Sequence, residues 1–157
     1  FGQQGYGYDT KRLHAEIGKI LGLDKKYKLI IVGAGNIGQA IANYAGFYEE
    51  GFEVLALFDK NPKLIGLKIR DIEIKDIDDL GSFIKSQEVE FGVICTPKET
   101  SQDMADILTE NGIKAIWNFA PLDIKVPERV SIEDVRLNES LYTLTYYYSR
   151  NNENTEE

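Results

Sequence analysis

Short apolar runs alternate along the chain with segments in which apolar residues recur every three or four positions. The runs are typical of strands buried on both faces, and the periodic segments are typical of helices with one buried side. The apolar runs fall at residues 28–32, 52–58, 91–95, 114–118 and 130–135. Residues 69–74 instead alternate apolar and charged side chains, which predicts a short strand with one exposed face.

Helical spacing follows most of these runs. A first helix is predicted to start at Asp9 or Thr10 and to stop at Gly22, and it carries the one histidine, His14, beside its apolar face. Further helices are predicted over 39–44, 77–84, 104–108 and 138–150. Because strands and helices alternate along the whole chain, the pattern predicts a doubly wound α/β fold. Its mostly parallel sheet carries helices on both faces, joined by right-handed crossovers.

A glycine-rich turn joins the first apolar run to the helix after it. It reads Gly33-Ala34-Gly35-Asn36-Ile37-Gly38. In this spacing the first glycine allows the tight turn, the second lets a pyrophosphate approach the backbone, and the third lets the helix pack closely on the strand. The free N–H groups of residues 36–38 then face the phosphates. Such a turn can also be purely structural, but its place after a buried strand predicts a dinucleotide-binding site of Rossmann type.

A carboxylate stands at the end of the second apolar run. Asp59 follows the glycine turn by about twenty residues, and a carboxylate there accepts hydrogen bonds from the adenine ribose hydroxyls. It also repels a 2′-phosphate, so NADH and NAD⁺ are the expected cofactors rather than NADP(H). Lys60 weakens this preference, because a neighbouring cation tolerates a phosphate.

The nicotinamide half of the cofactor is expected at the ends of two later runs. In this fold the ligand crosses the carboxyl ends of the strands. We therefore expect it near Cys95, Thr96, Pro97, Asn118 and Phe119. Cys95 is open to two interpretations: a redox-active thiol or, as is commoner at the end of an apolar run, a small buried hydrophobic residue.

Composition restricts the chemistry further. Lys and Arg number 18 and Asp and Glu 26, so the net charge of −8 disfavours binding of a nucleic-acid backbone or an anionic membrane by this chain's own surface. One cysteine and one histidine argue against an intrachain disulfide and against a Cys-rich or multi-His site, so no metal is expected. No apolar run reaches the length of a membrane span, and we expect a cytoplasmic protein.

No catalytic residue is predicted. A nicotinamide dehydrogenase needs a His, Lys or Tyr that moves a proton as the hydride moves. His14 precedes the glycine turn, Lys98 is a possible acid, and no second domain holds a substrate. The chain is therefore interpreted as a cofactor-holding domain that is not an enzyme. The cofactor domain of an NAD-dependent oxidoreductase is the alternative. A CoA-binding domain comes third, because Asp59 disfavours the 3′-phosphate of CoA.

The predicted last helix is apolar on more than one side. Leu137, Leu141, Leu144 and Tyr148 form one stripe, and the other faces carry Tyr142, Tyr146 and Tyr147. A helix that is apolar on several sides must be buried on several sides, and tyrosine is favoured at interfaces. This helix therefore predicts a homodimer, although a helix that only caps its own sheet is the alternative. Residues 151–157 are polar and acidic and are predicted to be disordered.

Longer stretches of sequence surround these motifs. They are F-G-Q-Q-G-Y-G-Y at 1–8, V-G-A-G-N-I-G-Q-A at 32–40, N-Y-A-G-F at 43–47, F-D-K-N-P at 58–62, T-P-K-E-T-S-Q at 96–102 and N-F-A-P at 118–121. Over nearly its whole length the chain thereby resembles the redox-sensing transcriptional repressors of the Rex family. The opening stretch and N-F-A-P make the resemblance specific, because the glycine motif alone is common.

The resemblance implies a domain organisation and a function. Residues 1–22 would be the junction to a winged-helix domain, 23–135 the Rossmann NAD(H)-binding domain, and 136–150 a dimerisation helix exchanged between subunits. The full-length homodimer would bind operator DNA when NAD⁺ dominates and would release it when NADH binds.

The resemblance also implies a relay between subunits, with one departure. Members of the family usually carry an aspartate at the position of Arg136, bonded to a tyrosine that matches Tyr44 and to an arginine of the winged helix. Tyr44 is thus expected close to the cofactor. Arg136 leaves the expected fold and cofactor site as they are, but it changes the expected wiring of the switch.

Overall fold

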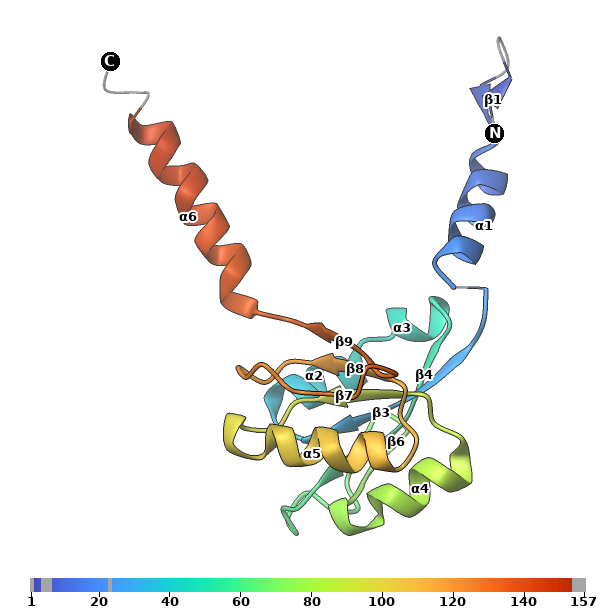
Figure 1. Ribbon diagram of the computed structural model, residues 1–157, viewed down its shortest axis with the longest axis vertical. Coiled ribbons are helices and arrows are strands. Elements are labelled where there is room, and N and C mark those ends of the chain that lie inside the picture. The colour runs from blue at the N-terminus through green and yellow to red at the C-terminus, as the bar shows by residue number, and fades with distance from the viewer. Residues whose placement is uncertain (1, 4–6, 23, 154–157) are drawn as a thin grey trace.

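The computed structural model describes residues 2–3, 7–22 and 24–153, and its centre is a seven-stranded sheet (Figure 1). Within these residues the parallel strands are β3 (Tyr27–Val32), β4 (Phe52–Asp59), β6 (Ile72–Asp76), β7 (Phe91–Ile94), β8 (Ala115–Asn118) and β9 (Ser131–Asp134). The order across the sheet is β5-β6-β4-β3-β7-β8-β9, with β5 (Lys68–Ile69) antiparallel at one edge. The parallel strands thus follow the order 3-2-1-4-5-6 of dinucleotide-binding α/β folds. The predicted doubly wound fold is confirmed.

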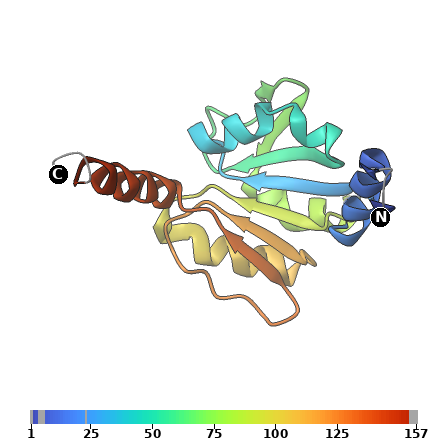
Figure 2. The same cartoon turned by 90° about the horizontal axis from the view of Figure 1, so that it is seen from above.

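Helices cover both faces of the sheet (Figure 2). One face carries α2 (Asn36–Asn43) and α3 (Gly46–Glu49), and the other carries α4 (Leu80–Gln87), which follows the 3₁₀ turn η1 (Ile77–Asp79), and α5 (Lys98–Glu110). Along β3, Leu29 and Ile31 pack into the core on the α2 face, and Ile30 and Val32 pack into the core on the α4–α5 face. Both faces of this strand are buried, which explains its uninterrupted apolar run.

Two connections differ from the predicted alternation. Residues 69–74 do not form one strand, because the chain turns at Arg70, whose φ of 56° lies in the left-handed region, and β5 and β6 pair as a hairpin. The connection from β8 to β9 carries no helix in the structure. Its segment, residues 119–130, contains Pro121 and Pro127, which lack the N–H that a helix interior needs.

The N-terminal part forms a short ribbon and a helix. Strands β1 (Gly2–Gln3) and β2 (Gly7–Tyr8) pair antiparallel, and α1 spans Thr10–Ile20. Of the two predicted caps, Asp9 is the one used: its carboxylate accepts from the backbone N–H groups of Lys11 at 3.1 Å and Arg12 at 3.2 Å. His14 lies on the exposed surface of this helix.

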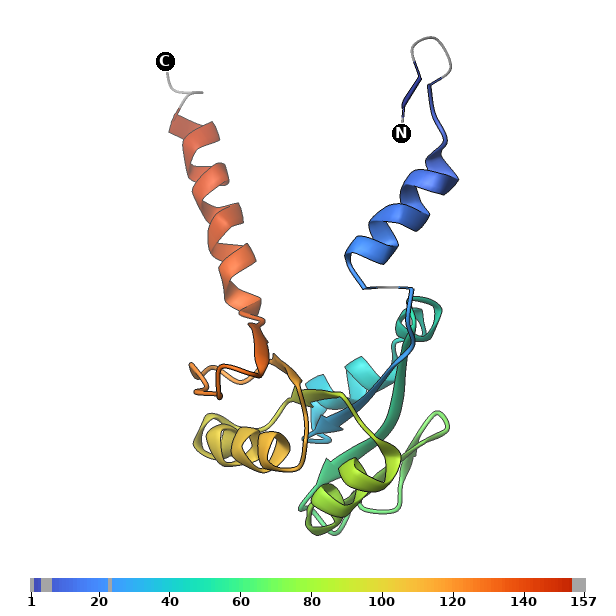
Figure 3. The same ribbon diagram turned by 45° about the vertical axis from the view of Figure 1, so that its right-hand side comes forward.

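Helix α6 (Leu137–Glu153) stands away from the sheet in all three views (Figures 1–3). All its side chains that the structure describes, including every leucine and tyrosine of the predicted apolar stripe, are exposed. The alternative that this helix caps its own sheet is therefore wrong. The helix also continues three residues past its predicted end, so residues 151–153 of the predicted disordered tail are helical. Residues 154–157 lie outside the described residues.

Candidate dinucleotide-binding site

The candidate site lies where the strand order reverses. Strands β3 and β7 are neighbours at the centre of the sheet, but the helix after β3 lies on one face and the helix after β7 on the other. In open α/β sheets this arrangement leaves a crevice outside the carboxyl ends of the strands. The glycine turn, Asp59, Thr96 and Asn118 all follow or end strands at this edge.

Two glycines of the turn are required by the protein itself. Gly33 has a φ of +100°, and a Cβ there would lie 2.7 Å from the carbonyl oxygen of Cys95 at the end of β7. A Cβ at Gly38 would lie 1.9 Å from the carbonyl oxygen of Gly33. Helix α2 can therefore start close to β3 only because both positions lack a side chain. Both residues are buried, so they shape the site without lining it.

No contact within the protein explains why the middle position of the turn, residue 35, is a glycine. A Cβ at Gly35 would meet nothing within 4 Å. Gly35 is also the N-cap of α2, and no side chain caps that helix. Its first N–H groups, at Asn36 and Ile37, therefore face an open and exposed edge with the positive end of the helix dipole. The open space and the uncapped helix end fit an anionic group such as a pyrophosphate.

Asp59 connects the second strand to the turn. One carboxylate oxygen accepts a hydrogen bond from the N–H of Ala34 at 2.8 Å, and the other accepts from the N–H of Asn61 at 2.8 Å. Each oxygen keeps a further lone pair for a ribose hydroxyl. Ala34 was predicted to line the site, but it has no accessible surface and its N–H is already used. It therefore belongs to the frame of the turn. Lys60 lies beside Asp59 and is exposed.

The end of β7 carries a hydroxyl without a partner. The Oγ1 of Thr96 is buried, and no hydrogen bond to it is found among the described residues. A buried hydroxyl without a partner is costly, so a bound ligand that accepts its proton would be stabilised there. Burial raises the pKa of the neighbouring Cys95 thiol to about 12. Cys95 is thus protonated at neutral pH and packs as a small hydrophobic residue, while Pro97 is exposed at the start of α5.

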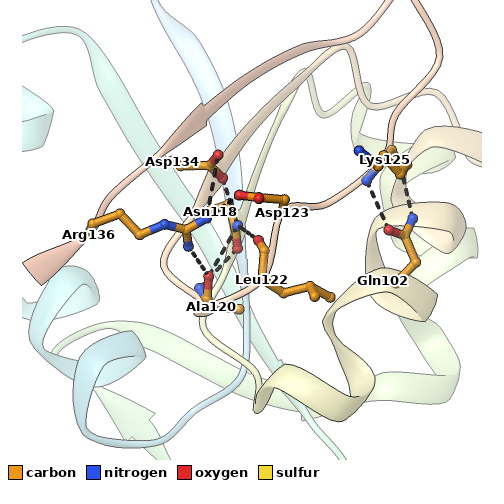
Figure 4. A network of polar contacts seen from close by, with 8 residues as sticks. All are labelled: Gln102, Asn118, Ala120, Leu122, Asp123, Lys125, Asp134 and Arg136. Atoms are coloured by element: carbon orange, nitrogen blue, oxygen red, sulfur yellow. Dashed lines mark hydrogen bonds and ion pairs between the residues drawn. The ribbon is translucent and has the colours of Figure 1, made fainter.

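Asn118 has a different role from the one predicted. Its side chain is fully buried, and its Nδ2 donates to the carbonyl oxygens of Ala120 and Leu122 and, at 2.8 Å, to the carboxylate of Asp134 (Figure 4). Its Oδ1 accepts from the N–H of Ala120 at 2.9 Å. Asn118 therefore holds the loop after β8 and has no accessible surface for a ligand. The next residue, Phe119, is half-buried and reaches the surface.

A chain of aromatic contacts links Phe119 to Tyr44. The ring centroids of Phe119 and Trp117 are 4.7 Å apart, those of Trp117 and Phe47 5.8 Å, and those of Phe47 and Tyr44 4.7 Å. Tyr44 is 61% exposed and follows the C-terminal end of α2, a helix length away from the glycine turn. Sequence reasoning missed Phe47 and Trp117, because each falls in a segment that was interpreted only as core or as part of a motif.

The described residues offer neither a metal site nor a membrane-spanning helix. No group of three or more His, Cys, Asp and Glu side chains there could hold a metal ion. No helix in that part of the chain is long and apolar enough to cross a membrane. Lys98 is exposed at the first position of α5. Taken together, the strand order and the glycine turn define an α/β domain of the Rossmann type.

Comparison with known proteins places this domain in a family. The family described as "CoA binding domain" matches residues 24–122, so the chain carries a domain of that family. The redox-sensing transcriptional repressor Rex of Clostridium botulinum (strain Alaska E43 / Type E3) is 60% identical over 146 residues, which are 93% of this chain and 70% of that protein. The chain belongs to the Rex family of redox-sensing transcriptional repressors.

Solved structures of a Rex-family repressor, RSP, share the fold. RSP in complex with β-NADH matches with a TM-score of 0.91 at 48% identity, over 96% of this chain and 73% of that one. RSP in complex with β-NAD⁺ and operator DNA matches with a TM-score of 0.89 at 49% identity, over 99% of this chain and 72% of that one.

Two glycines of the turn, Gly35 and Gly38, allow a matched pair of alanine variants. Gly38→Ala should destabilise the fold by ~3 kcal/mol or more, because its Cβ meets backbone that cannot move aside. Gly35→Ala should change the free energy of unfolding by less than ~1 kcal/mol, because its Cβ points into open space and the weaker N-cap is offset by a stiffer unfolded chain. Urea unfolding of both variants measures the difference. Equal destabilisation would contradict the assignment of Gly35 to a ligand.

Proposed function

We propose that this chain binds NADH and NAD⁺ at the carboxyl edge of its sheet and senses their ratio as part of a transcriptional repressor that releases DNA when NADH binds. The observation that carries the proposal is the glycine turn. Gly35 opens a space that the protein does not fill, at an uncapped helix N-terminus, and Asp59 stands beside it on the next strand.

The residues at this edge suit the parts of a dinucleotide. The N–H groups that open α2 would hold the pyrophosphate, and the free lone pairs of Asp59 would accept from the adenine ribose hydroxyls. The unpartnered hydroxyl of Thr96 would find an acceptor on the ligand. Pro97 and Phe119 would then lie beside the nicotinamide ring, whose charge and planarity are what oxidation changes. The bound ring supplies only the signal, because the proposed role includes no hydride transfer.

Sensing requires unequal affinities. A ligand shifts a conformational equilibrium only by its difference in affinity for the two states, so NADH must bind the DNA-free arrangement better than the DNA-bound one. The coupling is reciprocal, so DNA must weaken NADH binding by the same factor. The two RSP complexes support this proposal, because one is a complex with β-NADH and the other is a complex with β-NAD⁺ and operator DNA. Such a repressor would act in the cytoplasm, where bacterial DNA lies.

The same edge offers little for catalysis. The one histidine, His14, is exposed on α1, which precedes the glycine turn in the chain, and the relatives are transcriptional repressors. Lys98 is the nearest candidate for a proton donor, and its side chain is exposed to water. We therefore propose a binding domain without turnover.

A homodimer would cover the apolar surfaces that one subunit leaves exposed. On α6 these are Leu141, Leu144 and the tyrosines, and on α1 they are Ile17 and Ile20. The two helices leave the sheet from its two ends (Figure 3). The α2 face of the sheet also has an apolar groove of about 450 Å³, whose lining includes Phe47, Phe52, Phe91, Trp117 and Ile132. The exposed face of an amphipathic helix from a second copy is chemically complementary to this groove, because the helix face and the groove lining are both apolar and aromatic.

The cofactor assignment predicts an order of affinities. NADH should bind more tightly than NADPH by roughly tenfold or more, since a 2′-phosphate beside Asp59 loses ~1–3 kcal/mol. Asp59→Ala should narrow this gap, and Lys60→Gln should widen it by removing the nearby cation. Gly35→Ala should weaken the binding of both. Calorimetric titration with NADH, NAD⁺, NADPH and CoA measures the series, and CoA as the tightest ligand would contradict the proposal.

The dimer assignment predicts that one stripe of α6 is buried between subunits. Leu141→Glu should weaken dimerisation by ~30-fold or more, because a carboxylate buried in an apolar contact costs ~2 kcal/mol or more. Thr143→Glu adds the same charge on the opposite side of the helix and serves as the control. Sedimentation velocity over a dilution series gives the dissociation constants. A parent chain that is monomeric at micromolar concentration would rule out the dimer.

The switch itself is tested on DNA. The 157-residue chain should not shift operator DNA, because its net charge is −8 and its described helices include no basic recognition helix. The repressor that joins this chain to the winged-helix domain expected for its family should bind the operator in NAD⁺ and release it in NADH. Gel-shift titration measures both. Equal DNA affinity at saturating NADH and saturating NAD⁺ would show a protein that binds the cofactor without sensing its redox state.

A further inference from the structure

The side chain of Gln39, which directly follows the last glycine of the turn, folds back onto the turn. Its Nε2 donates to the carbonyl oxygen of Ala34 at 2.8 Å. The backbone N–H of the same residue donates to the carbonyl oxygen of Gly35 at 2.9 Å. Gln39 is half-buried in α2. It therefore holds both carbonyl groups that flank the α-carbon of Gly35.

Strand β4 holds the first part of the turn. The N–H of Gly33 donates to the carbonyl oxygen of Phe58 at 2.8 Å, and the N–H of Ala34 donates to the carboxylate of Asp59 at 2.8 Å. These two bonds fix the backbone as far as Ala34. They do not hold the peptide group between Ala34 and Gly35, whose carbonyl oxygen is bonded by Gln39 instead.

The peptide group between Ala34 and Gly35 is free to turn over as far as packing is concerned. Reversing it changes ψ of Ala34 and φ of Gly35, and a glycine adopts positive and negative φ about equally readily. Gly35 is exposed, and a Cβ there would meet nothing within 4 Å. Its φ is −78°. Among the described residues, the bond from Gln39 is the contact that favours this orientation of the peptide group over the reversed one.

The orientation matters because the two ends of a peptide group carry opposite partial charges. In a trans peptide the C=O and the N–H point in opposite directions. With the carbonyl oxygen of Ala34 turned to Gln39, the N–H of Gly35 points away from Gln39, and it has no hydrogen-bond partner among the described residues. Reversal would replace this donor with a carbonyl oxygen, which repels an anion, beside the N–H groups that open α2.

We propose that Gln39 is a positioning residue for the pyrophosphate-binding turn: it holds the Ala34–Gly35 peptide group in the orientation that leaves a donor for an anion. This inference rests on the proposed function, because the anion is the pyrophosphate of the dinucleotide. Gln39 acts through the backbone of the turn, so it affects binding of the pyrophosphate and not of the adenosine. The carboxylate of Asp59, which would meet the adenine ribose, makes its own bonds to the backbone without Gln39.

The first test measures the orientation without any ligand. The three-bond NMR couplings between the amide proton and the two α-protons of Gly35 report its φ, and in the parent they should match a single φ near −78°. Gln39→Met keeps the length of the side chain but removes the donor, so its couplings should move toward an average over both orientations. Gln39→Lys keeps a donor and should retain the couplings of the parent. Ala40→Met places the same new side chain on the exposed neighbouring position and is the control.

The second test measures dissociation constants for adenosine, ADP-ribose and NADH by NMR titration, which reaches millimolar values. Gln39→Met should weaken the binding of ADP-ribose and of NADH by the same factor, roughly tenfold, because both carry the pyrophosphate. It should leave the binding of adenosine unchanged, since adenosine has no pyrophosphate. Ala40→Met should bind all three ligands as the parent does.

The outcomes separate this inference from the proposed function. The role of Gln39 is refuted if Gln39→Met binds ADP-ribose as tightly as the parent, or if it loses as much affinity for adenosine as for ADP-ribose. Unchanged couplings of Gly35 together with weaker binding of ADP-ribose would also refute it, because the side chain would then contact the ligand directly. If the parent binds neither ADP-ribose nor NADH, the proposed cofactor function fails, while the couplings still decide whether Gln39 orients the turn.

Discussion

The close approach of helix α2 to the turn after β3 is the constraint on which the rest of the structure depends. It requires that Gly38 bring no side chain against the carbonyl of Gly33, and that Gly33 bring none against the end of β7. The carboxylate of Asp59 then holds the turn from the neighbouring strand through the N–H of Ala34. These contacts fix the helix N-terminus at the edge of the sheet, where its free N–H groups can meet an anion.

The centre of the domain is a buried core, whereas its first and last helices expose apolar side chains. Helices cover both faces of the sheet at β3, but the apolar groove beside Trp117 and the faces of α1 and α6 stay exposed. Exposed apolar surface of this kind marks an interaction site. In the proposed homodimer, a second copy of the chain would cover these surfaces.

Two routes lead away from the end of β8 in the structure. One is apolar, from Phe119 through Trp117 and Phe47 to Tyr44. The other is polar, from Asn118 and Ala120 to Arg136. The family resemblance implies an aspartate at the position of Arg136. The arginine in this chain changes which groups the side chain at this position can hydrogen-bond. An arginine donates to carbonyls and carboxylates, whereas an aspartate can only accept.

The sequence by itself determined the fold class and the place of the glycine turn. These follow from local rules, because buried parallel strands need continuous apolar runs and a tight strand-to-helix turn needs glycine. Only the tertiary structure decided which of the predicted site residues are accessible. Asn118 and Ala34 end up buried with their hydrogen bonds used, because residues distant in sequence supply or complete those bonds: Asp134 for Asn118, and Asp59 for Ala34. The hydrogen bond from Arg136 to the carbonyl oxygen of Ala120 likewise depends on a contact between distant segments, which no local pattern predicts.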